Sequence, residues 1–249
     1  MIRVRLPAKT IPPEFLAAAK LELREVLAHF RNPKTRNRPF TFEAYQNKKL
    51  KAQLDGVFHG KCAYCEWRYE GGSYFEVEHY RPKSHYYWLA AEWSNLLPAC
   101  KRCNNGKRTK FPLADPRKQA RRKGEERREK PLLLNPCNPK LNPQDHLLFD
   151  TDDGAIKPAL HRRAQPSKIG ETSIAIYRLS RSGLSLDRKM WAIRVKDKIQ
   201  IRRLVELGGN AAAKKEAYQG LRHLLEPHQP FRALTIQILR ENGFGRQLT

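Results

Sequence analysis

The chain has 249 residues, with 49 Lys or Arg against 25 Asp or Glu, so its formal net charge is +24 and its isoelectric point is about 10.1. Hydrophobic residues make up 40% of the sequence, which excludes wholesale disorder and allows a sizeable core in at most two domains. No apolar run of about 18 residues is present and the first residues lack the apolar core of a signal peptide, so we expect a cytoplasmic protein without a membrane partner.

The excess of positive charge predicts a polyanionic partner. Nucleic acid is the first candidate, because each phosphate that a protein neutralises releases counterions. Two alternatives stay open at this point. The basic residues could simply keep the surface solvated, or they could form a face that docks on an acidic protein.

The N-terminal segment, residues 1–58, is predicted to hold two helices. Pro12-Pro13 suits the first turn of a helix, and apolar residues then recur at helical spacing as far as Phe30. A second helix is expected over residues 42–54, with Gly56 as its end.

The next segment, residues 59–115, is predicted to be the functional core. Residues 74–79 alternate in a way that is typical of a strand. One face of this strand carries Phe75, Val77 and His79, and the other carries Glu76 and Glu78. We expect a partner strand near residues 95–98 and a helix that begins near residues 100–104.

The remaining chain is predicted to consist of a connector with a β-hairpin, residues 116–160, and a helical region, residues 161–249. Residues 116–130 are dense in charge, which fits either an exposed helix or a mobile basic loop that could also contact phosphate. Asp153-Gly154 is typical of a hairpin turn. Four helices are expected around residues 169–179, 186–207, 211–225 and 231–240.

Four of the five cysteines form two pairs with the same spacing, Cys62-x-x-Cys65 and Cys100-x-x-Cys103. In a reducing compartment, clustered thiols are expected to bind metal rather than form disulfides. Four thiolates satisfy a tetrahedral zinc ion and leave no position for substrate, so we expect a structural zinc site. The alternative is four ordinary buried thiols. Cys137 is unpaired and is expected to be a small core residue.

A second group of polar residues lies between and just after these pairs: Glu78, His79, Asn95, Asn104 and Lys107. Carboxylate and amide oxygens are hard ligands that suit Mg²⁺, and a neutral imidazole can take a proton from an attacking water. A bound metal can stabilise the charge that develops at a phosphate. Together these residue types are suited to phosphodiester hydrolysis.

This ordered set resembles the zinc-bearing branch of the HNH (ββα-metal) endonucleases. The resemblance implies that His79 is the general base, that Glu78 and Asn104 bind a catalytic Mg²⁺ or Mn²⁺, and that Asn95 holds the hairpin loop and orients the histidine. Glu78 stands where the family usually has Asp, which keeps the charge and lengthens the side chain. Phosphate contacts are expected from Arg81, Lys83 and Lys107.

A closer resemblance, over residues 45–200, is to the PtuB-like HNH proteins of Septu and certain retron anti-phage systems. It rests on the run Glu78-His79-Tyr80-Arg81-Pro82-Lys83, on Trp93-x-Asn95-Leu96-Leu97 and on Cys103-Asn104-x-x-Lys107. In those systems the HNH protein works with an ABC/SMC-like ATPase, so the resemblance implies such a partner, with DNA, expected to be double-stranded, as substrate.

The fold class expected is therefore α+β and helix-rich, with a ββα-metal core and zinc knuckles between N- and C-terminal helices. The function expected is a metal-dependent HNH endonuclease. The alternative is a non-catalytic, zinc-stabilised module that binds nucleic acid or docks on an ATPase.

Overall fold

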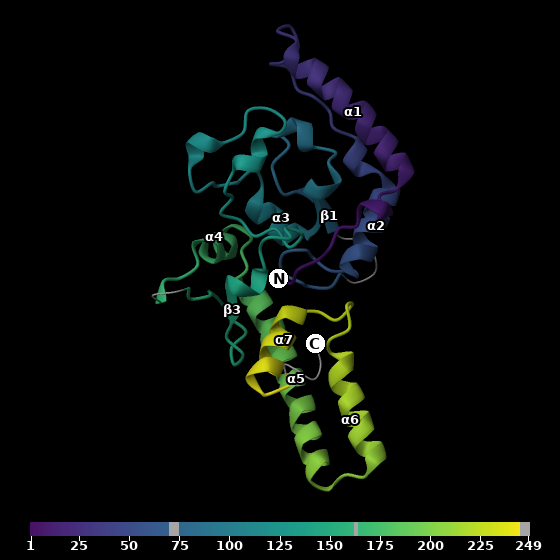
Figure 1. Ribbon diagram of the computed structural model, residues 1–249, viewed down its shortest axis with the longest axis vertical. Helices are drawn as coiled ribbons and strands as arrows, with labels where there is room; N and C mark the ends of the chain where they lie inside the picture. The colour runs from purple at the N-terminus through teal and green to yellow at the C-terminus, as the bar shows by residue number, and fades with distance from the viewer. Residues whose placement is uncertain (70–74, 162–163, 245–249) are drawn as a thin grey trace.

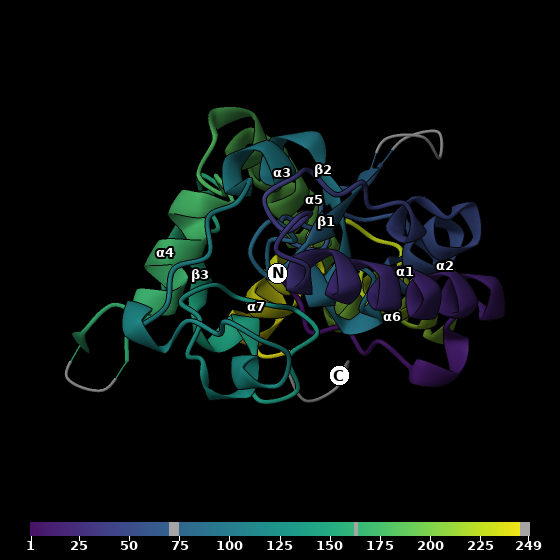
Figure 2. The same ribbon diagram turned by 90° about the horizontal axis from the view of Figure 1, so that it is seen from above.

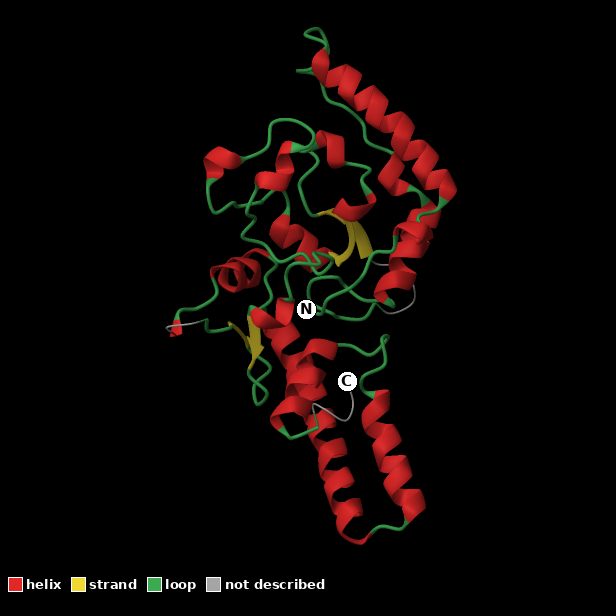
Figure 3. Cartoon of the chain, in the orientation of Figure 1, coloured by secondary structure: helices red, strands yellow, loops and turns green. Residues whose placement is uncertain are grey.

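The computed structural model describes residues 1–69, 75–161 and 164–244. Helices dominate the described chain, and its strands form two small antiparallel pairs (Figure 3). The predicted helix-rich α+β class is confirmed. Within the described ranges, no helix is long and apolar enough to cross a membrane.

The centre of the molecule is a ββα unit. Strand β1 (Phe75–His79) pairs antiparallel with β2 (Leu96–Cys100), and helix α3 (Lys101–Lys107) follows β2 without a loop. The expected strand start at Tyr74 lies outside the described residues. Because β1 alternates, its two acidic side chains lie on the face that α3 covers, and His79 ends the strand.

Two N-terminal helices lie on one side of this unit, opposite α4 (Lys168–Ile176), as Figures 1 and 2 show. Helix α1 spans Pro13–Arg31, and α2 spans Lys48–Phe58. The expected start and end of the second helix were wrong. The side chain of Asn47 accepts hydrogen bonds from the backbone N–H groups of residues 49 and 50, which fixes the start, and Gly56 lies inside the helix. The helix ends where His59 adopts the left-handed conformation, with φ of 53°.

The connector carries the predicted hairpin, formed by β3 (Leu147–Phe149) and β4 (Ile156–Pro158). Gly154 has a φ of 74°, and a Cβ added there would lie 2.0 Å from the carbonyl oxygen of Ser185. Only glycine fits a turn that packs this closely on a helix backbone.

Residues 116–130 do not form the exposed helix that was one alternative, and the structure shows them as a loop. They contain two short 3-10 turns, Pro116–Lys118 and Glu125–Arg128. The loop is held by Glu129, a buried carboxylate that accepts hydrogen bonds from Tyr86 Oη at 2.7 Å, the Ala120 amide at 2.8 Å and Arg81 Nε at 2.8 Å.

The C-terminal helices are α5 (Ser182–Gly208), α6 (Ala211–His223) and α7 (Arg232–Glu241). Helices α5 and α6 run antiparallel and form an arm that extends away from the ββα unit (Figure 1). Helix α7 packs against α5, where Trp191 Nε1 donates to Thr235 Oγ1 at 2.9 Å.

The largest hydrophobic cluster is continuous from the cysteines through the connector to α5 and α7. A smaller cluster joins α1 and α2 to the start of β2, through residues such as Phe15, Leu54 and Leu96. The candidate site residues of β1 and β2 therefore lie on a hairpin that is packed from both sides. The predicted division into four segments stays a prediction.

Candidate functional site

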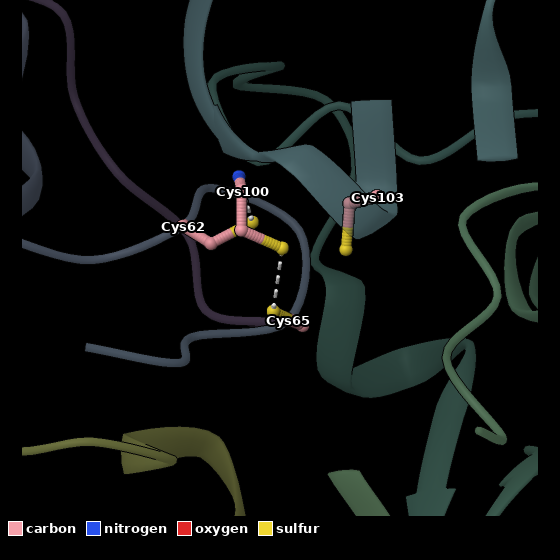
Figure 4. Close-up of side chains that lie close together, drawn as sticks. All are labelled: Cys62, Cys65, Cys100 and Cys103. Atoms are coloured by element: carbon pink, nitrogen blue, oxygen red, sulfur yellow. Dashed lines mark hydrogen bonds between the residues drawn. The ribbon is translucent and has the colours of Figure 1, made fainter. Parts of the chain in front are cut away.

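The two cysteine pairs come together at one end of the ββα unit (Figure 4). Cys62 and Cys65 lie in the loop that follows α2, Cys100 ends β2, and Cys103 lies in α3. All four side chains are buried and their sulfur atoms lie within 4.8 Å of one another.

This spacing suits zinc. The edge of a tetrahedron built from Zn–S bonds of about 2.3 Å is about 3.8 Å. The distance between Cys65 Sγ and Cys100 Sγ is 3.8 Å, and the Cys100 amide donates to Cys62 Sγ at 3.3 Å. The cluster could therefore hold a zinc ion with no large change in the protein.

Arg181, which precedes α5, is a part of this centre that the sequence reasoning missed. Its guanidinium lies 3.6 Å from Cys103 Sγ, 3.5 Å from Cys65 Sγ and 3.8 Å from Cys100 Sγ. Four thiolates around Zn²⁺ carry a net charge of −2, so a cation that donates to three of them lowers the cost of burying the centre. No spacing rule would have found it, because it lies 78 residues beyond Cys103.

His79 ends β1 with its side chain almost fully buried. Its Nε2 lies 2.8 Å from the carbonyl oxygen of Ala90, and its ring packs edge-on against Tyr45 at 4.8 Å between centroids. A carbonyl oxygen only accepts hydrogen bonds, so Nε2 carries the proton and Nδ1 keeps its lone pair. Burial lowers the pKa of His79 to about 4, which keeps the imidazole neutral at pH 7.

Asn95 ties together the loop between β1 and β2. Its side-chain oxygen accepts from the Arg81 amide at 2.8 Å, and its Nδ2 donates to the carbonyl oxygens of Arg81 and Leu89 at 3.0 Å each. The bond to Leu89 holds the main chain at this point. It therefore also positions the neighbouring carbonyl group of Ala90, which accepts the hydrogen bond from His79.

The acidic face of β1 meets α3 through two polar pairs. Lys107 Nζ lies 2.5 Å from Glu78 Oε1, and Asn104 Nδ2 donates to Glu76 Oε2 at 2.5 Å. Glu78 and Asn104 thus lie at the same interface, but each contacts a different partner. Glu76 was not singled out from the sequence, although its position two residues before Glu78 on an alternating strand places it on the same face.

Burial raises the pKa of Glu78, Lys107 opposes that shift, and the neighbouring Glu76 adds to it. Two carboxylates and one amide oxygen within this interface are the donor set that Mg²⁺ or Mn²⁺ prefers. The residue types present are therefore ones that a divalent cation accepts as ligands.

The three expected phosphate contacts differ in their accessibility. Lys107 has no exposed surface, so it cannot touch a nucleic acid in this structure, and that prediction is corrected. Arg81 is paired with Glu129 and packs over the ring of Phe111, so a phosphate would have to displace its ion pair. Lys83 is partly exposed and donates to Tyr45 Oη at 2.8 Å, beside His79.

Residues 62–110 match the HNH endonuclease family. The chain is 37% identical over 202 residues to the Septu protein PtuB of Bacillus mycoides (strain KBAB4), a match that covers 76% of this chain and 66% of that protein. It is 46% identical over 72 residues to the Septu protein PtuB of Bacillus thuringiensis, which covers 27% of this chain and 28% of that protein.

A third match, 29% identical over 149 residues, is to the Septu protein PtuA of Bacillus mycoides (strain KBAB4) and covers 54% of this chain and 20% of that protein. The chain thus spans just under two thirds of the first relative and smaller shares of the other two. The HNH match covers the segment that contains both the four cysteines and the polar residues of β1 and α3.

Proposed function

Starting from the HNH segment at residues 62–110, we propose that the protein is a metal-dependent endonuclease that hydrolyses phosphodiester bonds of DNA in a Septu-type anti-phage defence system. The proposal rests mainly on the protonation state and the position of His79. It is neutral, it is held by a carbonyl on one nitrogen, and it stands at the end of a strand whose adjacent face is lined with carboxylates.

His79 acts as the general base. The bond to Ala90 uses Nε2, which leaves the lone pair of Nδ1 to accept from a water molecule. Asn95 positions it indirectly, because the bonds of Asn95 to residues 81 and 89 fix the segment whose carbonyl orients the ring. An imidazole that is already held in position loses little entropy when it takes the proton.

Glu78 and Asn104 hold the catalytic Mg²⁺ or Mn²⁺, with Glu76 as a further carboxylate beside them. When bound, the ion supplies positive charge next to the scissile phosphate and its leaving oxygen. Lys107 balances the buried carboxylate of Glu78, and Lys83, which is partly exposed, is the cation that contacts the phosphate backbone.

The four cysteines hold zinc in a structural role, because four protein ligands leave no open position. They join the loop after α2 to β2 and α3, and so keep the nuclease hairpin in place. An ABC/SMC-like ATPase, as in Septu and certain retron systems, is the proposed partner, and double-stranded DNA is the proposed substrate.

A plasmid cleavage assay tests the proposal. Purified protein, alone and co-purified with an ATPase subunit, is incubated with supercoiled DNA and Mg²⁺ or Mn²⁺. We expect nicked or linear DNA that disappears with EDTA and with His79→Ala. His85→Ala is the matched control, because His85 also bonds a carbonyl through Nε2, at 2.9 Å from Ala120 O, but lies outside the site.

If His79→Ala cleaves like the wild type, the assigned base is wrong. If DNA is bound but is not cut under any of these conditions, the alternative of a non-catalytic binding module replaces the nuclease.

A further inference from the structure

A second cluster of metal-ligating side chains lies far along the chain from the nuclease segment, in the turn between α6 and α7. His223 ends α6, and Glu226 and His228 follow within five residues. Glu226 Oε2 lies 3.0 Å from His223 Nδ1 and 3.5 Å from His228 Nε2. All three side chains are exposed, at 54%, 44% and 46% of their surface, so an ion can reach them from solvent.

These distances match those that a bound ion would impose. Bonds of about 2.0–2.1 Å from zinc to nitrogen or oxygen give a ligand-to-ligand edge of about 3.3 Å in a tetrahedron. The two measured distances bracket that value. Little movement is then needed to place an ion among the three donors, since they belong to one short turn.

Gln229 contacts both imidazoles, but only in His223 does it bond the ring nitrogen that lies away from Glu226. Its side-chain amide lies 2.9 Å from His223 Nε2 and 3.4 Å from His228 Nε2, and the residue is buried. The amide oxygen and nitrogen of glutamine exchange by a rotation, so this group can accept the Nε2 proton of His223. The bond would leave the Nδ1 lone pair of His223 facing Glu226, as in metal sites where a second group fixes the histidine tautomer.

The main chain of the turn is also bonded to the rest of the protein. The carbonyl oxygen of Gln229 accepts from Lys61 Nζ at 2.9 Å, and both residues are buried. The turn is also the carboxyl end of α6, a helix of 13 residues, where the helix dipole favours a cation.

We infer that His223, Glu226 and His228 form a surface site for a divalent transition-metal ion such as Zn²⁺, separate from the four cysteines and not used in the proposed cleavage. Two imidazoles and one carboxylate are a donor set that zinc accepts, and the exposed side leaves a fourth position for water or for a group of another molecule. Through Lys61, which directly precedes Cys62, an ion here would stiffen the contact between the helical arm and the zinc loop.

The number of zinc ions bound per chain, measured on the purified full-length protein, tests this inference. After dialysis against zinc at micromolar concentration, we expect two zinc ions per chain in the wild type and one in His223→Gln/His228→Gln. His161→Gln removes an exposed histidine outside the cluster and should keep two ions. Substitution with Co²⁺ separates the sites, because the thiolate site gives strong charge-transfer absorption and the second ion adds only weak visible bands.

A thermal shift provides a second readout that does not depend on nuclease activity. In protein whose four-cysteine site is already filled, added zinc should raise the melting temperature of the wild type, since an ion that binds only the folded state stabilises it by mass action, and should leave the double variant unchanged. The inference is overturned if the wild type binds a single zinc ion, if the double variant keeps the second one, or if His161→Gln loses it as well.

Discussion

Lys107 Nζ lies 2.5 Å from Glu78 Oε1, and the two side chains are 0% and 6% exposed. The same ammonium donates to the carbonyl oxygen of His79 at 2.7 Å. A single buried cation therefore ties α3 to the last two residues of β1, the proposed metal ligand and the proposed base. An ion pair and a hydrogen bond, in addition to packing, therefore connect the β1–β2 hairpin to helix α3.

The first prediction concerns this pair. Lys107→Met keeps the unbranched chain of the side chain, shortened by one atom, and removes its charge, which leaves the carboxylate of Glu78 buried without a counterion. Breaking a buried ion pair in this way costs about 3–5 kcal/mol of folding free energy. Urea denaturation of the full chain measures the loss.

The double variant Glu78→Gln/Lys107→Met is the control, because it removes both charges. It should recover most of the lost stability, as buried pairs replaced by neutral groups often do. If Lys107→Met is as stable as the wild type, the ion pair is not formed in solution.

Much of the core was predictable because short-range patterns determine it. The alternation of residues 75–79 was enough to place Glu76 and Glu78 on one face of β1 and His79 on the other, and the cysteine spacing was enough to predict the cluster. The start of α2 was missed because the local cap at Asn47 outweighed the apolar spacing upstream. Helix propensity is a weak guide where a cap decides the boundary.

The contacts that the sequence could not reveal are long-range ones. Arg181 reaches the cysteines from the start of α5, and Glu129 reaches Arg81 across 48 residues. The basic run at 116–130 suggested an exposed surface, yet a single acidic residue within it is buried and organises the loop. Such pairings depend on how the elements pack and leave no periodicity in the chain.

The second prediction concerns Arg181. In the zinc-loaded protein, Arg181→Ala removes the cation that contacts three of the thiolates, so their repulsion and their exposure to water increase. We expect zinc to pass to a colorimetric chelator at least tenfold faster than from the wild type, and Arg181→Lys to show an intermediate rate because lysine keeps the charge without the planar fork.

Arg194→Ala is the matched control, since Arg194 lies in α5, the helix that Arg181 directly precedes, and packs over Trp191 instead of the cysteines. Equal release rates in Arg181→Ala and Arg194→Ala would show that Arg181 does not act on the zinc centre.

The third prediction concerns the connector. Glu129→Gln weakens the buried bonds to Tyr86, Ala120 and Arg81 and leaves the guanidinium without its counterion. Residues 116–130 contain eight Lys or Arg, so trypsin should cut this loop faster once it opens more often. Limited proteolysis followed by mass spectrometry measures the rate at each site.

Glu125→Gln should leave that rate unchanged, because Glu125 pairs with Arg122 on the surface, where an ion pair contributes little. Faster cleavage in both variants would mean that charge in the loop, rather than the buried anchor, controls its opening.

The last prediction concerns zinc removal. The four cysteines belong to the same hydrophobic cluster as α5 and α7, so the zinc centre is part of the main core and not an appendage. Metal binding and folding are coupled in such sites. We expect a strong chelator, or Cys62→Ser, to abolish the near-UV circular dichroism and cooperative melting of the whole described core.

Cys137→Ser should melt like the wild type, because Cys137 is only partly buried and lies outside the four-cysteine cluster. A chelated protein that still melts cooperatively at the wild-type temperature would show that the core folds without metal, and the four thiols would then be ordinary buried cysteines.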